Sequence, residues 1–215
     1  MKSREIKWGI IGPGQIARKF ARSLQEVDDA QLYAVASRTL ERAEAFAEET
    51  GAAKAFGSYE EMLMDAEVDV VYIATPHVFH KEHTLLSLKH GKPVLCEKPF
   101  AINRAQVKEM ISNAKEKRVF LMEAMWTPFL PHIIYLREVL SSGKYGKVKR
   151  LTADFGFAAA FDKNGRLFKK SLGGGSLLDI GIYPIFLALH TLGKPEKISA
   201  KAQMSSTNVD EVCEV

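Results

Sequence analysis

The sequence predicts an α/β protein: a doubly wound parallel sheet followed by an α+β domain with a mixed, largely antiparallel open sheet. Three observations carry this prediction. Short apolar runs alternate with helical patterns up to residue 125, a glycine-rich turn follows the first run, and the alternation stops after two prolines near Trp126. We therefore expect two domains, residues 1–122 and 123–215.

The first part contains six apolar runs that are typical of strands. Between them, five segments repeat apolar residues at helical spacing, for example Ile16, Phe20 and Leu24. The predicted strands are 6–11, 31–37, 53–57, 68–76, 93–99 and 119–125, and the helices that follow the first five are 16–27, 39–50, 59–66, 81–91 and 102–118.

In the second part, the regular alternation of strand and helix patterns stops. We predict helices over 132–143 and within 173–193, and strands over 147–158 and 196–206. The chain stops at 210–215, "DEVCEV", which is typical of the start of a strand, so we expect a truncated second domain with an unfinished sheet edge.

Composition excludes several function classes. The net charge is +4, with basic residues scattered along helical segments, which indicates a solvated surface and no nucleic-acid partner. Cys96 and Cys213 are far apart, so neither a disulfide framework nor a cysteine zinc site is expected, and a reducing cytoplasm fits. No apolar run reaches the roughly 18 residues of a membrane span, so no membrane partner is expected.

The glycine-rich turn, GxGxxA, consists of Gly12, Pro13, Gly14, Gln15 and Ile16 followed by an alanine. It lies after a strand and opens a helix, where the backbone approaches a pyrophosphate closely and the helix N-terminus supplies N–H groups. It indicates a Rossmann-type dinucleotide-binding domain. The alternative is a tight turn that binds nothing.

The second strand ends without the carboxylate that binds the adenine ribose of NAD. Ser37 and Arg38 stand there instead, and Arg42 follows one helical turn later. A hydroxyl and guanidinium groups suit a 2′-phosphate, so we predict NADP as the cofactor, with NAD as the alternative. The alternative is that both arginines are solvated residues at the start of a helix.

The fourth strand ends in Thr75, Pro76 and His77, with His80 and His83 next. Ligands of open α/β sheets bind at this edge, so we predict that the first four contact the cofactor near the nicotinamide. The HxxHxxH spacing also fits a metal, but no acidic or cysteine ligand accompanies it, and we predict no metal site.

The fifth strand ends in Glu97, Lys98 and a proline. We predict Glu97 and Lys98 at the cofactor, where an ammonium can stabilise negative charge and lower the pKa of a neighbouring acid. Asp179 and Tyr183 share a face of the later helix, after three glycines. We predict Lys98, Tyr183 and Asp179 as catalytic, with Tyr183 as general base. Each residue alone also fits a surface or core role.

The segments that carry this pattern resemble the glucose-fructose oxidoreductase/inositol dehydrogenase (Gfo/Idh/MocA) family. The similarity is highest to its branch of dimeric dihydrodiol dehydrogenases and NADP-dependent D-xylose 1-dehydrogenases. The matching segments are "GIIGPGQIA", "VASRTLERAEAFA", "VDVVYIATPHVFH", "VLCEKPF", "LMEAMWTPFLP" and "GGGSLLDIGIYP".

The resemblance implies NADP, the pair Lys98 and Tyr183 with Asp179 in support, and a homodimer or larger assembly through the C-terminal sheet. Many members of the family have histidine where Tyr183 stands. Trp126, Arg166 and Asp179 are candidate substrate contacts. We therefore expect an NADP-dependent dehydrogenase of a sugar or cyclic diol; the alternative is a non-catalytic dinucleotide-binding redox sensor or interaction module on the same fold.

Overall fold

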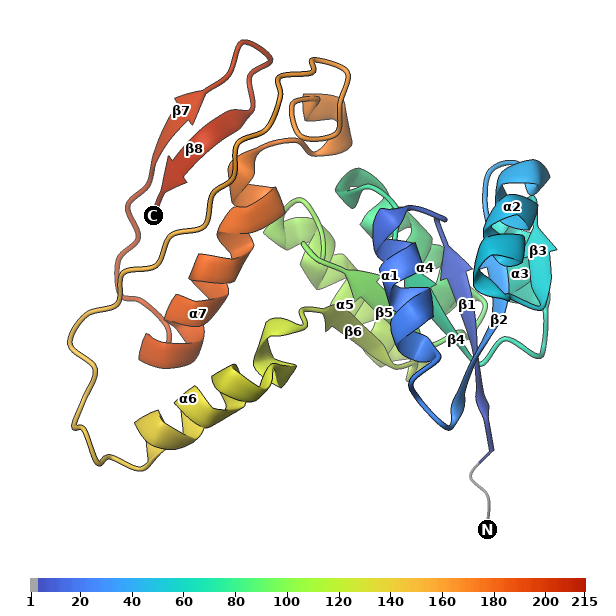
Figure 1. Cartoon of the computed structure of the whole chain (residues 1–215), viewed down its shortest axis with the longest axis horizontal. Helices are drawn as coiled ribbons and strands as arrows, with labels where there is room; N and C mark the ends of the chain where they lie inside the picture. The colour runs from blue at the N-terminus through green and yellow to red at the C-terminus, as the bar shows by residue number, and fades with distance from the viewer. Residues whose placement is uncertain (1–3) are drawn as a thin grey trace. The chain divides into compact units, whose positions relative to one another are not determined.

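The computed structural model describes residues 4–215 and divides the chain into two compact units (Figure 1). The first unit ends at Ala124 and the second begins at Met125. The sequence alone places a boundary between residues 122 and 123, at the last strand of the first unit. Each unit is described by itself.

The first unit is a sheet of six parallel strands in the order β3-β2-β1-β4-β5-β6. The predicted doubly wound sheet is confirmed. Its strands are β1 (Ile6–Ile11), β2 (Ala30–Ala36), β3 (Lys54–Phe56), β4 (Val70–Ile73), β5 (Val94–Glu97) and β6 (Leu121–Ala124). Its helices are α1 (Gln15–Leu24), α2 (Leu40–Thr50), α3 (Tyr59–Met64), a short 3₁₀ turn η1 (His77–Phe79), α4 (His80–Lys89) and α5 (Arg104–Lys117).

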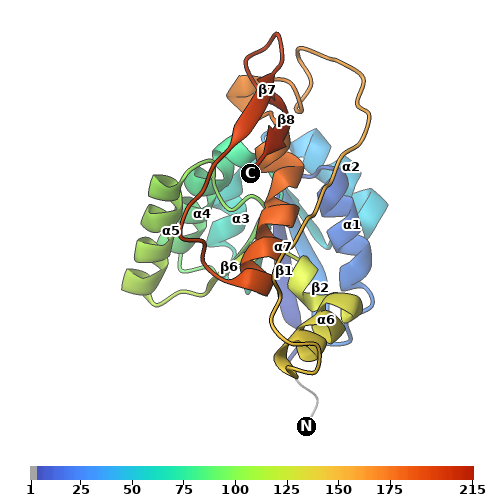
Figure 2. The same cartoon turned by 90° about the vertical axis from the view of Figure 1, so that its left-hand side faces the viewer.

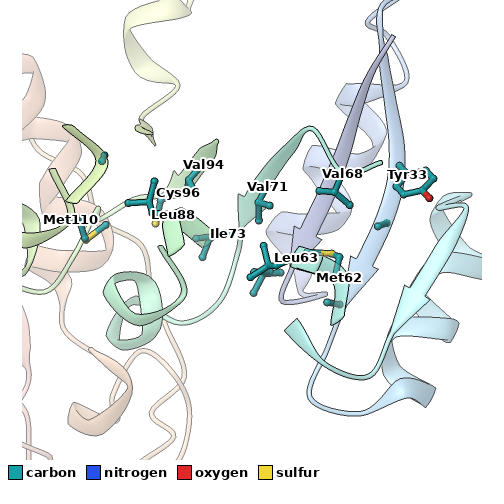
Figure 3. Close-up of a cluster of buried hydrophobic side chains, with 14 of the residues drawn as sticks. Tyr33, Met62, Leu63, Val68, Val71, Ile73, Leu88, Val94, Cys96 and Met110 are labelled. Carbon is teal, nitrogen blue, oxygen red and sulfur yellow. The ribbon is translucent and has the colours of Figure 1, made fainter. Parts of the chain in front are cut away.

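Two apolar cores lie on opposite faces of this sheet, because successive side chains of a strand point to opposite faces. Tyr72 packs with Phe46 and other residues of α1 and α2 on one face, whereas its neighbours Val71 and Ile73 pack with α3, α4 and α5 on the other. Figure 3 shows the second cluster. Burial of each large apolar side chain contributes about 1.5–3 kcal/mol, so the sheet is a rigid support for the residues at its edge.

The second unit contains η2 (Thr127–Phe129), α6 (Pro131–Ser141), η3 (Lys170–Leu172), η4 (Leu177–Gly181), α7 (Ile182–Leu192), β7 (Lys201–Met204) and β8 (Asp210–Glu214). The last two strands pair as an antiparallel hairpin (Figure 2). The strand predicted over 147–158 is wrong: this segment has no regular structure. No described strand pairs with it, so its alternating pattern has no ladder to join.

The helix predicted within 173–193 begins with an unexpected π-helical turn, η4. Regular α-helix starts only at Ile182. Two residues explain this locally. Gly181 has a low helix propensity, and Pro184 has no N–H to donate to the preceding turn, so α-helical winding is weakened in the turn that ends at Gly181. Such π turns are frequent at functional sites.

One helical stretch of the described residues, 170–192, is long and apolar enough to cross a membrane by length and composition. This differs from the expectation that no run is long enough, because that expectation counted only unbroken apolar residues. The stretch contains four glycines and the ion-paired Asp179. Its regular helix, α7, has 11 residues, or about 16 Å, about half of a bilayer core. It is weak evidence for a membrane.

Candidate active site

The turn between β1 and α1 has two glycines with different environments. Gly12 has φ 91°, and a Cβ there would lie 2.7 Å from the Thr75 methyl carbon, at the end of β4. Gly14, the N-cap residue of α1, has extended backbone, and no atom lies within 4 Å of its hypothetical Cβ. The fold itself therefore requires glycine at position 12, whereas the space at position 14 is open to a ligand.

The N-terminus of α1 has the chemistry of an anion site. No side chain caps this helix, and its first turn carries no acidic residue. The first N–H groups of a helix have no partner within it, and they lie at the positive end of its dipole. Gln15 and Ile16 open this helix, directly after Pro13 and Gly14. The geometry fits the pyrophosphate of a dinucleotide.

Positive charge gathers after β2. Arg38 and Arg42 are exposed, and among residues 4–215 neither forms an ion pair. Both guanidinium groups act to lower the pKa of the Tyr59 hydroxyl, although burial has the larger effect and raises it. Both arginines therefore lie near Tyr59. Ser37 is 3% exposed, so its hydroxyl lies below this surface. The two arginines can hold a 2′-phosphate.

The histidines after β4 are held by the protein itself. His80 is completely buried, with Nδ1 2.8 Å from the Pro99 carbonyl oxygen and Nε2 2.8 Å from that of Thr75. Burial lowers the pKa of His80, while its two hydrogen bonds oppose this shift. His80 therefore joins the β4 turn to the Lys98 turn, with each ring nitrogen facing a carbonyl oxygen, and this indicates a positioning role. The predicted cofactor contact of His80 stays a prediction.

The neighbouring histidines are also buried. His83 accepts or donates a hydrogen bond of 3.0 Å with the Thr75 hydroxyl, and burial lowers its pKa to about 4. His77, which follows Pro76, is 6% exposed, and its ring meets that of His80 edge-on. Within the described part of the chain, no three histidine, cysteine, aspartate or glutamate side chains are grouped to hold a metal ion.

Two carboxylates, the buried Glu97 and the half-buried Glu123, hold the turn that carries Lys98. Glu97 accepts hydrogen bonds from the Tyr72 hydroxyl and, at 3.1 Å, from the Lys98 backbone N–H. Glu123, on the next strand, accepts from the Phe100 N–H at 2.9 Å. The intervening Pro99, which follows a cis peptide bond, has no N–H. Every backbone N–H of the turn 98–100 is thus bound by a carboxylate.

This arrangement gives Glu97 a role inside the protein. Both of its carboxylate oxygens are used inside the protein, and the side chain is 9% exposed. Burial raises the pKa of Glu97, an effect that the hydrogen bonds from Tyr72 and Lys98 oppose. Glu97 therefore positions Lys98 through the backbone, and its predicted cofactor contact stays a prediction. Tyr72 was missed by sequence reasoning, because its pattern is that of an ordinary core residue.

The second unit brings Arg166 and Asp179 together. The guanidinium donates to both carboxylate oxygens of Asp179, at 2.9 and 3.4 Å, and Asp179 is 8% exposed. Such two-point pairing fixes the plane of the carboxylate. Arg166 was predicted to contact substrate; the structure shows that it pairs with Asp179, and the substrate contact stays a prediction. The predicted substrate residue Trp126 is partly exposed, at the start of η2.

Tyr183 lies in the first turn of α7, after the π turn that carries Asp179. Its ring is half-buried and packs against that of Phe155, with the ring centres 5.5 Å apart. Lys98 belongs to the first unit, whereas Asp179 and Tyr183 belong to the second. The pairing of Lys98 with Tyr183 stays a prediction.

Both units match known protein families. Residues 6–125 match the family described as "Oxidoreductase family, NAD-binding Rossmann fold" (GFO_IDH_MocA), and residues 133–215 match the "GFO/IDH/MocA C-terminal domain". Curated relatives include the trans-1,2-dihydrobenzene-1,2-diol dehydrogenases of Mus musculus, 44% identical over 214 residues, and Homo sapiens, 42% identical over 218. Each comparison covers 98% of this chain but 64% of the relative.

Solved structures agree with this assignment. A 3-ketoreductase from Actinomadura kijaniata, in complex with NADP and TDP-benzene, superposes with a TM-score of 0.90 at 30% identity, over 98% of this chain and 65% of the other. An NAD-binding oxidoreductase from Klebsiella pneumoniae superposes with a TM-score of 0.78 at 26% identity, over 94% of this chain and 57% of the other. The chain thus spans less than two thirds of the length of these relatives, and it belongs to the GFO/IDH/MocA family of oxidoreductases.

Proposed function

We propose that this protein is an NADP-dependent oxidoreductase that moves a hydride between nicotinamide and a hydroxyl-bearing carbon of a sugar or cyclic diol. One observation carries the proposal: an uncapped helix N-terminus with open space at Gly14 adjoins a strand whose end presents Arg38 and Arg42 and no carboxylate. The curated relatives, which are dihydrodiol dehydrogenases, and the NADP-bound 3-ketoreductase support the same chemistry.

The reaction needs a hydride acceptor and a base. NADP+, when bound, supplies the acceptor. In the proposed mechanism Tyr183 removes the proton of the substrate hydroxyl, and the Lys98 ammonium lowers the pKa of Tyr183. The carboxylate of Asp179, fixed by Arg166, orients the same hydroxyl. The carbon loses its hydride as the C=O bond forms, so charge and protons balance.

The test compares the wild-type protein with Lys98→Met. Turnover is followed at the NADPH absorbance with a panel of aldoses and trans-dihydrodiols, with NADP and NAD in parallel, and NADPH affinity is followed by fluorescence titration. General base catalysis contributes about 10²–10⁴ in rate, and in this mechanism Tyr183 needs the Lys98 ammonium to act as the base. We expect that loss in Lys98→Met, with NADPH affinity largely unchanged.

The matched control is Lys89→Met, because Lys89 is an exposed lysine in the last turn of α4. It should behave as the wild type. Wild-type turnover by Lys98→Met would refute the mechanism, and a preference for NAD would refute the role of Arg38 and Arg42. NADPH binding with no turnover across the panel would favour the alternative, a non-catalytic redox sensor.

Assembly and location complete the proposal. We propose a cytoplasmic homodimer, or a larger assembly, formed through the C-terminal sheet. All four residues of β7 are exposed, and an exposed strand edge is a template for pairing with a second chain. Sedimentation or light scattering tests the assembly.

A further inference from the structure

The hairpin of β7 and β8 has an unusually well-bonded turn. The Ser205 hydroxyl accepts hydrogen bonds from the backbone N–H groups of Thr207, at 3.2 Å, and Val209, at 3.4 Å, and the Ser205 N–H donates to the Val209 carbonyl at 2.8 Å. Ser205 and Val209 are buried, 8% and 4% exposed. The turn is therefore fixed up to the residue that follows it, Asp210.

Asp210, the first residue of β8, reaches the start of the helix that carries the candidate catalytic residues. One carboxylate oxygen accepts hydrogen bonds from the Leu177 backbone N–H at 2.6 Å and from the Ser176 hydroxyl at 2.8 Å. The other lies so near Gly175 that a Cβ there would be 2.2 Å away. The carboxylate thus fits against the first turn of the helix, where glycine leaves the necessary room.

No residue local to this helix provides that cap. Ser176, at the N-cap position, makes no side-chain cap hydrogen bond, and its hydroxyl donates to Asp210. An unbound N–H at a helix start costs stability, and a negative charge there interacts favourably with the helix dipole. Asp210, more than 30 residues along the chain, therefore supplies from another element what a local N-cap residue normally supplies.

The position of this cap links it to the proposed chemistry. Asp179 and Tyr183 follow Leu177 within the next two turns, and the first of these is the π turn. π turns are frequent at functional sites, and Asp210 holds the first N–H of this one. We propose that Asp210 is a positioning residue: it fixes the rotation of this helix start, and through it the placement of Asp179 and Tyr183. The proposal rests on the proposed function for its effect on turnover.

The experiment measures amide hydrogen exchange over 177–183 together with kcat, KM and NADPH affinity, well below the unfolding midpoint. Asp210→Ala should raise the exchange rate at Leu177 about tenfold or more, because the N–H loses its acceptor. It should lower kcat about tenfold or more, since small misplacements of reacting groups are costly. NADPH affinity should stay within about twofold, because the cofactor residues lie in the first unit.

Two further variants separate positioning from general destabilisation. Asp210→Asn keeps an oxygen that can accept hydrogen bonds from both donors. Its exchange rate at Leu177 and its kcat should therefore lie between those of the wild type and Asp210→Ala. If Asp210→Ala fails to fold, Asp210→Asn alone tests the positioning role. Glu211→Ala removes the exposed neighbouring carboxylate and should change nothing.

Wild-type kcat and exchange in a folded Asp210→Ala would overturn the proposal, as would a loss of NADPH affinity equal to the loss of kcat. A wild-type protein with no turnover would refute the proposed function. The exchange pattern would still decide in that case: unchanged exchange in the Asp210 variants would overturn the positioning role, and raised exchange would support it.

Discussion

The two glycines of the dinucleotide turn should respond differently to the same added methyl group. In Gly12→Ala the φ of 91° is unfavourable for a side chain, and the new Cβ would lie 2.7 Å from the Thr75 methyl and 3.1 Å from its backbone nitrogen. A left-handed backbone costs about 1–2 kcal/mol, and overpacking about 1–3 kcal/mol. We expect a loss of about 2–5 kcal/mol in the free energy of unfolding.

Gly14→Ala should leave the fold unchanged and still weaken cofactor binding. Its φ of −115° is open to any residue, and no atom lies within 4 Å of the new Cβ. The free energy of unfolding should change by no more than about 0.5 kcal/mol. If the pyrophosphate occupies that space, NADPH affinity falls at least about tenfold, which corresponds to about 1.4 kcal/mol.

Denaturant unfolding and NADPH fluorescence titration measure the two effects separately. Gly51→Ala is a matched control, because Gly51 has φ 78° but no atom within 4 Å of its added Cβ. Gly51→Ala therefore introduces the backbone strain without the clash, and it should lower the free energy of unfolding by less than Gly12→Ala does. Unchanged NADPH affinity in Gly14→Ala would refute the placement of the cofactor, and wild-type stability in Gly12→Ala would refute the packing argument.

Two more predictions concern the carboxylate beneath Lys98. Tyr72→Phe removes a donor to the buried Glu97 and should lower the free energy of unfolding by about 1–3 kcal/mol, whereas the exposed Tyr135→Phe should not; equal unfolding curves would contradict the network. Burial raises the pKa of Glu97, so the folded state binds the proton of this carboxyl more tightly than the unfolded state does. The contribution of Glu97 to the free energy of unfolding is therefore lost as the pH rises through that pKa. Glu97→Gln should therefore show a smaller decline in the free energy of unfolding as the pH rises above the ordinary pKa of a glutamate. An unchanged slope would count against an ionisable group at this position.

Much of the first unit follows from local pattern. The runs at 6–11 and 68–76 and the helical spacing of Ile16, Phe20 and Leu24 become strands and a helix of a parallel sheet, because each has the period of its element. The carboxyl ends of parallel strands meet at one edge of the sheet, so the sequence alone predicts that Gly12, Thr75 and Lys98 lie in one region.

The second unit was predicted less well. The run 147–158 alternates like a strand, yet pairing needs a neighbouring strand, which no local pattern supplies. The π turn at Leu177–Gly181 likewise depends on how the helix start is held, although Gly181 and Pro184 gave a local hint.

The sequence by itself determined the fold class, the dinucleotide turn and the residue types of the candidate site, because these depend on periodicity and on short motifs. Only the tertiary structure decided what supports them: Tyr72 beneath Glu97, Arg166 on Asp179, and Asp210 at the start of the Tyr183 helix. Each of these contacts joins residues 13 or more positions apart. Such partners are chosen by how the elements pack, and packing leaves no periodic mark in the sequence.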